Sequence, residues 1–323
     1  MTNLSATNSI LRRFDPAVLT AFGCIIVLLL FGSIVNENFL SPEYLLQQLQ
    51  VGSFLALVST GMMIVILLGQ IDLSVPWIIT VGGMMSTAAA GWGPWGATFA
   101  IPVGILCGLA FGLINGIGVA YLRVPSMIFT LAINSVALGL MTVRTGGFAP
   151  QDMATQAMNE LATGHLVFGI PNPVWVWIAV GGVTVFLLRR TVFGRAVYAI
   201  GNREIAAYLS GIRTQRVVLA AFAISGALSA FAGALLAGYS TKAYQGMGDP
   251  YLLPSIAAVV LGGTSILGGR GTYLGTVAGI ILITLLQSIL SVVQIEEAFR
   301  QLIYGAVIIG MLLLYGRAPP SRS

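Results

Sequence analysis

Long stretches without a charged side chain limit what this sequence can fold into. The fifty residues 73–122 contain no Lys, Arg, Asp or Glu, and residues 217–241 and 271–295 are also free of charge. Of the 323 residues, 57% are hydrophobic and only 8% are charged. A soluble globule of that composition would lack the polar surface that it needs to face water. The sequence therefore predicts a membrane protein of one domain.

Apolar segments near the ~20 residues that a bilayer core requires recur about ten times along the chain. They fall at residues 17–35, 45–68, 76–90, 97–122, 125–143, 173–188, 217–238, 254–267, 272–293 and 301–315. Three of them, 173–188, 254–267 and 301–315, are short for a full crossing, and any of these could be tilted, half-spanning or re-entrant. The predicted fold is an all-α polytopic membrane protein with about ten transmembrane helices.

The charged residues that remain are divided between the two sides of this topology. Twelve of the fifteen basic residues fall where the topology places the cytoplasm, and seven of the ten acidic residues fall on the other side. This is the positive-inside pattern, so the net charge of +5 indicates membrane orientation and no nucleic-acid partner. Both termini are expected in the cytoplasm, with tails at 1–16 and 317–323 and the transmembrane domain at 17–316.

Glycine spacing predicts where helices approach closely. Glycines recur every fourth residue in two runs, which are Gly104, Gly108, Gly112 and Gly116, and Gly271, Gly275 and Gly279. Such ridges let helix backbones come together in lipid. Two interruptions of the apolar pattern, at 69–75 and 262–271, each precede a glycine-ridge helix and suggest an internal repeat of the kind found in transporters.

The chain lacks the residues that a nucleotide site or a catalytic centre needs. A P-loop requires Gly-Lys-Ser/Thr, whereas the single lysine, Lys242, follows Thr241 in an expected outer segment. His165 is the only histidine, so a metal cluster or a histidine-based triad has no partners. We expect no catalytic residue, metal or cofactor on this chain, and any driving energy must come from a partner or an ion gradient.

The strongest functional signal is the cytoplasmic segment 191–216, which lies in the most arginine-rich part of the chain. A short amphipathic helix is predicted there, with Asn202 as its N-cap, Glu204 in its first turn and Gly211 at its end. An exposed helix between two spans offers a soluble partner something to bind.

Several short motifs, in order along residues 45–315, carry a family resemblance. Residues 194–195, 198–201, Glu204 and 209–212 resemble the cytoplasmic loop of permease subunits of ribose-type ABC importers. Further motifs of that family are resembled by residues 69–75, by 115–116 with 123–124, and by 257–276. One departure is Pro76, where the family commonly has glycine.

The resemblance implies an inner-membrane permease paired with a second copy or a close paralogue. It also implies a cytoplasmic ATPase subunit that binds ATP and Mg, a periplasmic sugar-binding protein, and a monosaccharide or related polyol as cargo. The segment that couples to the ATPase would then include Asn202, Glu204, Ala206, Ala207, Gly211 and Ile212.

Residues for the translocation pathway are predicted from polar side chains at membrane depth. Asp72 is the one acid that interrupts an apolar region, and it either serves transport or caps a helix start near the cytoplasmic face. The neutral candidates are Gln70, Asn115, Asn134, Thr264 and Ser265. Hydrogen bonding between helices explains each of these neutral groups equally well.

On the outer side, Asp249, Glu296 and Glu297 are candidates for docking the binding protein, because rim charges set register and on-rate. Three alternatives to the sugar permease remain open. One is a permease of the related branched-chain amino-acid importers, another is a secondary transporter or channel that works alone, and the last is a membrane enzyme.

Overall fold

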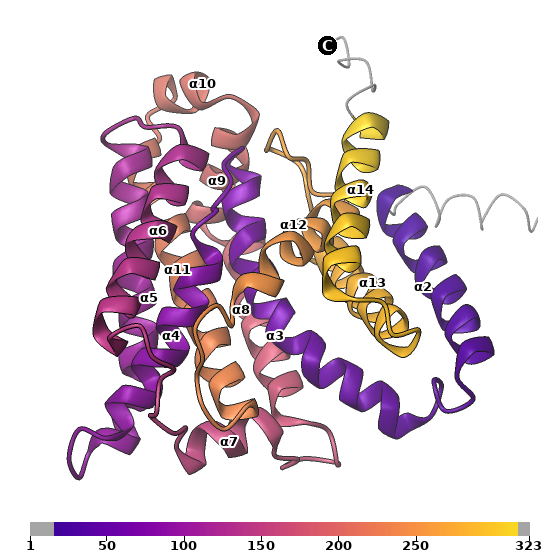
Figure 1. Ribbon diagram of the computed structural model, residues 1–323. Helices are drawn as coiled ribbons and strands as arrows, with labels where there is room; N and C mark the ends of the chain where they lie inside the picture. Colours follow the sequence, from indigo (N-terminus) through magenta and orange to yellow (C-terminus); the bar gives the residue numbers. More distant parts are fainter. Residues whose placement is uncertain (1–15, 316–323) are drawn as a thin grey trace, which may run out of the picture.

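The computed structural model describes residues 16–315, and helices dominate this range (Figure 1). No strand occurs between residues 16 and 315, where only two isolated bridges are found. The all-α prediction is therefore confirmed for this range. The predicted tail 317–323 and all of the tail 1–16 except Pro16 lie outside the described residues. The helices are α2 (Pro16–Val35), α3 (Pro42–Leu67), α4 (Val75–Ala90), α5 (Gly96–Ala120), α6 (Ser126–Thr145), α7 (Gln156–Thr163), α8 (Asn172–Arg190), α9 (Val192–Asn202), α10 (Glu204–Leu209), α11 (Thr214–Tyr239), the 3-10 helix η1 (Asp249–Tyr251), α12 (Leu252–Leu261), α13 (Tyr273–Val292) and α14 (Glu297–Tyr315).

Six of these helices, α3, α5, α6, α8, α11 and α13, are long and apolar enough to cross a membrane. Shorter apolar helices occur at Thr20–Val35, Val75–Ala90, Asp249–Leu261 and Ala298–Gly310. Together they fall on the ten apolar segments of the sequence. The protein is thus a multi-pass membrane protein.

The predicted span 254–267 is only partly helical. Helix α12 has ten residues, which rise about 15 Å, roughly half of a ~30 Å bilayer core. It stops at Leu261 because Gly262 and Gly263 follow, and Gly263 has a left-handed φ of 87°. The predicted short span 173–188, in contrast, lies in the nineteen-residue helix α8.

The glycine ridge of α5 packs where the sequence predicts close packing. A Cβ added at Gly108 or Gly112 would overlap backbone atoms of α11, and one at Gly104 would overlap α4. In the second run, Gly279 faces the backbone of α12 and Gly275 that of Gly262 just after α12, whereas Gly271 lies before α13. Helices α5 and α11 therefore form the centre of one group, and α12 and α13 that of another.

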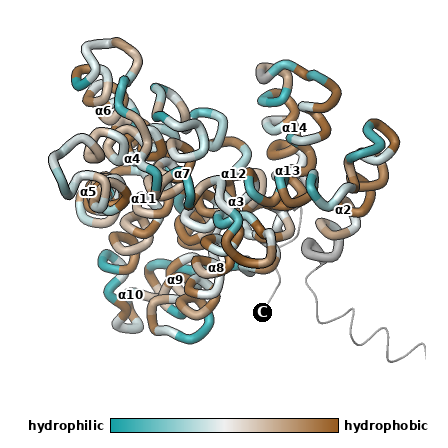
Figure 2. The backbone as a smooth tube through the Cα atoms, turned by 90° about the horizontal axis from the view of Figure 1, so that it is seen from below, coloured by the Kyte–Doolittle hydropathy of each residue, from teal (hydrophilic) through white to brown (hydrophobic). Residues whose placement is uncertain are grey.

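The two ends of the molecule differ in charge. At one end, the last turn of α8, helix α9, the first turn of α11 and the nearby connections carry Arg123, Arg189, Arg190, Arg195, Arg203, Arg213, Arg216 and Arg270. We call this the basic end; it is uppermost in Figure 1, where α2 starts and α14 finishes on the same side. Helix α7 lies at the opposite end. Between the ends, Ile128 and Leu131 of α6 and Leu106 of α5 are exposed as lipid-facing side chains would be. Figure 2 shows hydrophobic residues along most helices and hydrophilic ones mainly in the connections.

Candidate functional site

The segment predicted as one helix at 202–212 forms the end of one helix and all of another. Asn202 is the last residue of α9 and does not cap α10. Its side-chain amide donates to the Tyr198 carbonyl at 2.9 Å. The helical conformation is interrupted at Arg203, whose backbone is extended with φ −162°. Helix α9 starts where Thr191 accepts a hydrogen bond from the Gly194 amide at 3.4 Å. The prediction of Asn202 as an N-cap was therefore wrong, because the helical pattern starts ten residues earlier.

The predicted end of the second helix is confirmed. Gly211 has a left-handed φ of 85°, which favours glycine. Its amide donates to the Tyr208 carbonyl at 3.0 Å, and the Ile212 amide donates to the Ala207 carbonyl at 3.1 Å. This pair of bonds is the Schellman arrangement that closes a helix. Glu204 lies in the first turn of α10, as predicted.

Helix α10 presents an apolar surface at the basic end. Ile205 is 77% exposed, Tyr208 66% and Leu209 79%. Of the predicted coupling residues, Ala206 is exposed, whereas Ala207 is buried against the bundle. The surface is thus made by three residues that the sequence reasoning missed, although a short helix in a basic loop with large apolar residues is itself a signal for a partner.

Beneath α10, α9 contacts the end of α3 and the second interruption of the apolar pattern, the loop 262–271. The Tyr198 hydroxyl donates to the Gly271 carbonyl at 2.9 Å. A Cβ on Gly201 would overlap the carbonyl oxygen of Leu67 and the amide of Gly269. The Gly269 amide in turn donates to the Leu67 carbonyl at 2.9 Å. We call this meeting of the ends of α3 and α9 with the loop 262–271 the glycine junction.

The protonation state of Tyr198 is consistent with its hydrogen bond to Gly271. Burial of the ring raises the pKa of Tyr198, while the nearby Arg189 charge lowers it by less. The hydroxyl therefore keeps its proton and remains a donor to Gly271.

Asp72 lies in the break 68–74 between α3 and α4 and is fully buried. Its Oδ1 accepts from the Ser74 amide at 3.0 Å and from the Ser74 hydroxyl at 2.5 Å. Its Oδ2 lies 3.5 Å from the donating Ser225 hydroxyl of α11. Asn115 of α5 donates to the Ser74 oxygen at 2.7 Å. The carboxylate thus satisfies donors at the start of α4 and connects them to α11, and Ser74 extends the network to α5. Asp72 is buried inside the bundle and does not lie at the surface, where a simple cap is expected.

A polar stripe on α6 holds the same break. The hydroxyls of Ser126 and Thr130 accept from the Ile71 and Leu73 amides at 3.3 and 2.9 Å. Asn134 accepts from the Trp77 amide at 3.3 Å. The stripe residues Ser126, Thr130 and Asn134 are four apart, so they share one helix face. Sequence reasoning found only Asn134, although this spacing could have shown all three.

The remaining pathway candidates lie in the two interruptions. Gln70 is half-buried in the break 68–74. Thr264 is buried in the loop 262–271, and its hydroxyl has no hydrogen-bond partner in the described structure. The Ser265 amide donates to the Arg270 carbonyl at 2.9 Å and so closes that loop. The structure brings Asp72 and Asn115 into one network but places Thr264 and Ser265 in a separate loop.

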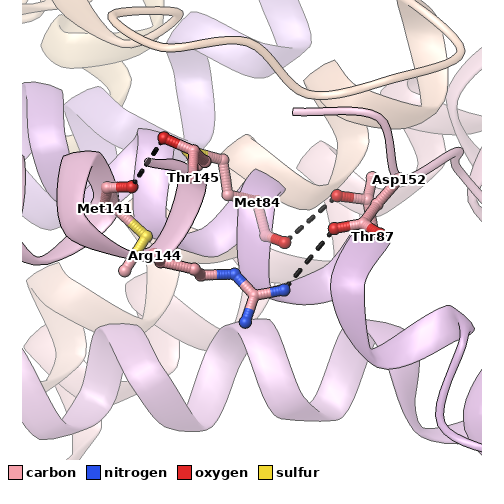
Figure 3. A network of polar contacts seen from close by, with 6 residues as sticks. All are labelled: Met84, Thr87, Met141, Arg144, Thr145 and Asp152. Carbon is pink, nitrogen blue, oxygen red and sulfur yellow. Dashed lines mark hydrogen bonds and ion pairs between the residues drawn. The ribbon is translucent and has the colours of Figure 1, made fainter. Parts of the chain in front are cut away.

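The predicted docking acids lie at the end opposite α10. Asp249 starts η1 and is exposed, Glu296 is exposed just before α14, and Glu297 is the first residue of α14. Other polar contacts lie at the same end. In Figure 3, Arg144 reaches from α6 toward Asp152, and the two groups lie 3.5 Å apart. Gln245 donates to the Thr145 hydroxyl at 2.8 Å.

Comparison with known proteins places this architecture in a family. Residues 44–312 match the family model described as the branched-chain amino acid transport system / permease component. The match covers most of the chain, from the start of α3 into α14. The chain belongs to this permease family. The sequence-based assignment to transport permeases is confirmed.

Named relatives of the permease cover nearly its whole length. The ribose import permease RbsC of Haemophilus influenzae is 34% identical over 91% of each chain. The L-arabinose ABC transporter permease AraH of Azospirillum brasilense is 32% identical over 88% of this chain and 84% of its own. The autoinducer 2 import permease LsrC of Escherichia coli is 30% identical over 93% of this chain and 86% of its own. No solved structure matches the permease significantly.

Proposed function

We propose that this permease forms the translocation pathway of a binding-protein-dependent ABC importer for a monosaccharide or related polyol. The observation that carries the proposal is the similarity, over most of each chain, to three permeases named for ribose import, L-arabinose ABC transport and autoinducer 2 import. The similarity extends over 84% or more of each of these relatives, so it includes the whole bundle and is not confined to one motif.

A branched-chain amino acid is the alternative cargo, because the family description names it. The named relatives favour a sugar. A transporter that works alone would have no use for the exposed apolar surface of α10.

The remaining parts of the proposal concern orientation and partners. The basic end faces the cytoplasm of a cell with an inner membrane. The chain then crosses about ten times with both termini inside, and a second copy or a close paralogue completes the transmembrane part. ATP and Mg bind to the ATPase subunit, which docks on α10, and a periplasmic sugar-binding protein docks at the opposite end.

Reconstitution tests this function. The permease would be placed in proteoliposomes with its ATPase and binding-protein partners, and uptake of labelled D-ribose, L-arabinose and L-leucine would be measured. We expect ATP-dependent uptake of a sugar and none of leucine. Leucine uptake would favour the alternative, and sugar uptake without ATP would contradict an ABC importer.

Docking on α10 can be tested at the same time. Replacing Ile205 and Leu209 with Ser removes exposed apolar area at the basic end without disturbing the core. Each buried leucine-sized side chain contributes roughly 1.5–3 kcal/mol to an interface, so ATPase co-purification should fall sharply. The matched control is Leu166→Ser, which removes a leucine that is 82% exposed at the opposite end. Equal co-purification in both variants would contradict docking on α10.

A further inference from the structure

A cavity of about 450 Å³ lies among α3, α11, α13, α14 and the segment 240–251. It is at the end opposite α10, because it lies beside the first turn of α3 and the last turn of α13. None of the pathway candidates predicted from the sequence lines it. Along α13 it extends from Ser291 to Thr284, seven residues deeper, or roughly 10 Å. Ligand sites range over about 300–1,000 Å³, so a single monosaccharide with some water fits this space.

The polar groups of the cavity are mostly neutral and can both donate and accept. Gln48 of α3 and Gln287 of α13 supply two amides. Ser288 and Ser291 supply hydroxyls from the same face of α13. Amides and hydroxyls carry donors and acceptors together, which matches the hydroxyl groups of a sugar. Tight charge-assisted bonds, which would slow release, are not needed for such a cargo.

Aromatic side chains provide the remaining recognition. Tyr44 comes from α3, Tyr244 and Tyr251 from the segment 240–251, and Tyr304 from α14. The first three are at least partly exposed and offer apolar ring faces to the C–H groups of a sugar and hydroxyls at their edges, whereas Tyr304 is buried in the wall. The Tyr44 hydroxyl lies 2.6 Å from the Ser288 oxygen, so a hydrogen bond connects α3 with α13 beside the cavity.

The charge of the lining discriminates between kinds of cargo. Arg300 is the one charged residue among the sixteen that line the cavity, and its Nε donates to the Ile295 carbonyl at 2.8 Å. None of the sixteen is Asp or Glu. The ammonium group of an amino acid would therefore lose its hydration without gaining an ionic partner, which is costly.

Thr284 also lines the cavity, and the residue is 6% exposed. Its hydroxyl is buried against Gly52 of α3 and has no hydrogen-bond partner in the described structure. A buried hydroxyl without a partner costs roughly 1–3 kcal/mol. Rotation of the side chain toward the cavity would let a bound polyhydroxylated molecule satisfy this hydroxyl and remove that cost.

We propose that this cavity is the first binding site for the monosaccharide on the permease, where the sugar moves from the binding protein toward the bundle. The proposal rests on the proposed function and adds to it the residues that hold the cargo. Gln48, Gln287 and Thr284 bind the sugar hydroxyls, and the three tyrosines that are at least partly exposed contact its ring.

The test compares two threonines on α13. Thr284→Val removes the unpartnered hydroxyl while keeping the shape of the side chain. Thr276→Val is the matched control, because Thr276 is also buried on α13 with an unpartnered hydroxyl but does not line the cavity. A second pair is Gln48→Leu with Gln47→Leu, since Gln47 is the exposed neighbour that does not line the cavity.

Uptake of labelled D-ribose and L-arabinose would be measured in the complete reconstituted complex, together with thermal stability of each variant. We expect Thr284→Val and Gln48→Leu to lower sugar uptake roughly 3- to 10-fold, as loss of one hydrogen bond predicts. Neither threonine variant should be less stable than wild type, and both control variants should transport normally.

Two outcomes separate this site from the proposed function. If wild type imports sugar and Thr284→Val transports as well as Thr276→Val, with Gln48→Leu equal to Gln47→Leu, the site is wrong and the function stands. If wild type imports neither sugar, the proposed function fails and the site fails with it. Lower stability that accounts for lower uptake would assign Thr284 a structural role and also overturn the site.

Discussion

The glycine junction and the outer cavity are built in opposite ways from the same kind of chain. At the junction, backbone meets backbone: Gly201 approaches Leu67 and Gly269 so closely that no Cβ fits. Around the cavity, side chains such as Gln48 and Gln287 line about 450 Å³ of open space between the helices. The glycine junction has no space for an additional group, whereas the cavity can hold a small molecule.

The difference shows how a membrane bundle combines rigidity with access. Small residues let helices approach in lipid, where no hydrophobic effect drives them together. Close backbone contact can then pass a movement of α9 to the end of α3 and to the loop 262–271, because no free space separates them. Polar side chains at the opposite end can change partners without moving a helix. The predictions that follow test whether the two regions differ in this way.

The largest effect is expected at Asp72, in the break that follows α3. Asp72→Leu leaves the Ser74 amide and hydroxyl without their acceptor, at roughly 1–3 kcal/mol for each buried donor. Asp72→Asn keeps an oxygen for both bonds, and its amide can donate to the Ser225 hydroxyl. Transport should therefore be lost in the Leu variant and largely kept in the Asn variant. Uptake across a pH series measures this, and equal loss in both variants would mean that the charge itself is required.

Gly201→Ala should have the next largest effect. The new methyl group overlaps the Leu67 carbonyl, so the backbone must move, at about 1–3 kcal/mol for an overpacked site. Gly182→Ala is the control, because a Cβ there meets nothing within 4 Å. Alanine in that helix should stabilise by roughly 0.5–1 kcal/mol. The unfolding temperatures of the two purified variants should shift in opposite directions. If Gly201→Ala is as stable as Gly182→Ala, the junction can accommodate a methyl group.

The sequence predicts these two regions unequally, for a physical reason. Glycine spacing is local, so the ridges on α5 and α13 and the interruptions at 69–75 and 262–271 could be located from the sequence alone. That the end of α3 meets the loop 262–271 at Leu67 and Gly269 depends on tertiary packing, and no spacing along the chain contains it.

The cavity could not be predicted from the sequence at all. Gln48 and Gln287 are far apart in the sequence, on α3 and α13, and each looks like an ordinary polar residue in an apolar segment. In the same way, Asn202 resembled a helix cap because the N-cap of α9 at Thr191, which lies between arginines and apolar residues, was not recognised in the sequence. Charged residues were easier to interpret, since their cost in a membrane singles them out.

A smaller effect is expected from the acids at the outer end. Reversing Glu296 and Glu297 to Lys should slow docking of the binding protein by roughly tenfold at low salt, because rim charges mainly set the rate of encounter. The corresponding double Gln variant should fall between wild type and the Lys variant. The measurement is ATP hydrolysis stimulated by the binding protein, with basal hydrolysis unchanged. An effect that persists at high salt would contradict steering, since screening acts over about 8–10 Å.

The smallest effect is expected at the exposed ion pair between Arg144 and Asp152 (Figure 3). The two side chains are 37% and 47% exposed and their groups are 3.5 Å apart. Exposed pairs contribute about 0.2–1 kcal/mol, and salt screens them further. Asp152→Asn should therefore shift thermal unfolding only slightly at low salt and not at all at high salt. If Asp152→Asn lowered the unfolding temperature as much as Asp72→Leu does, the outer connections would stabilise the bundle as strongly as the buried break. The contrast between a tight basic end and an adaptable outer end would then no longer hold.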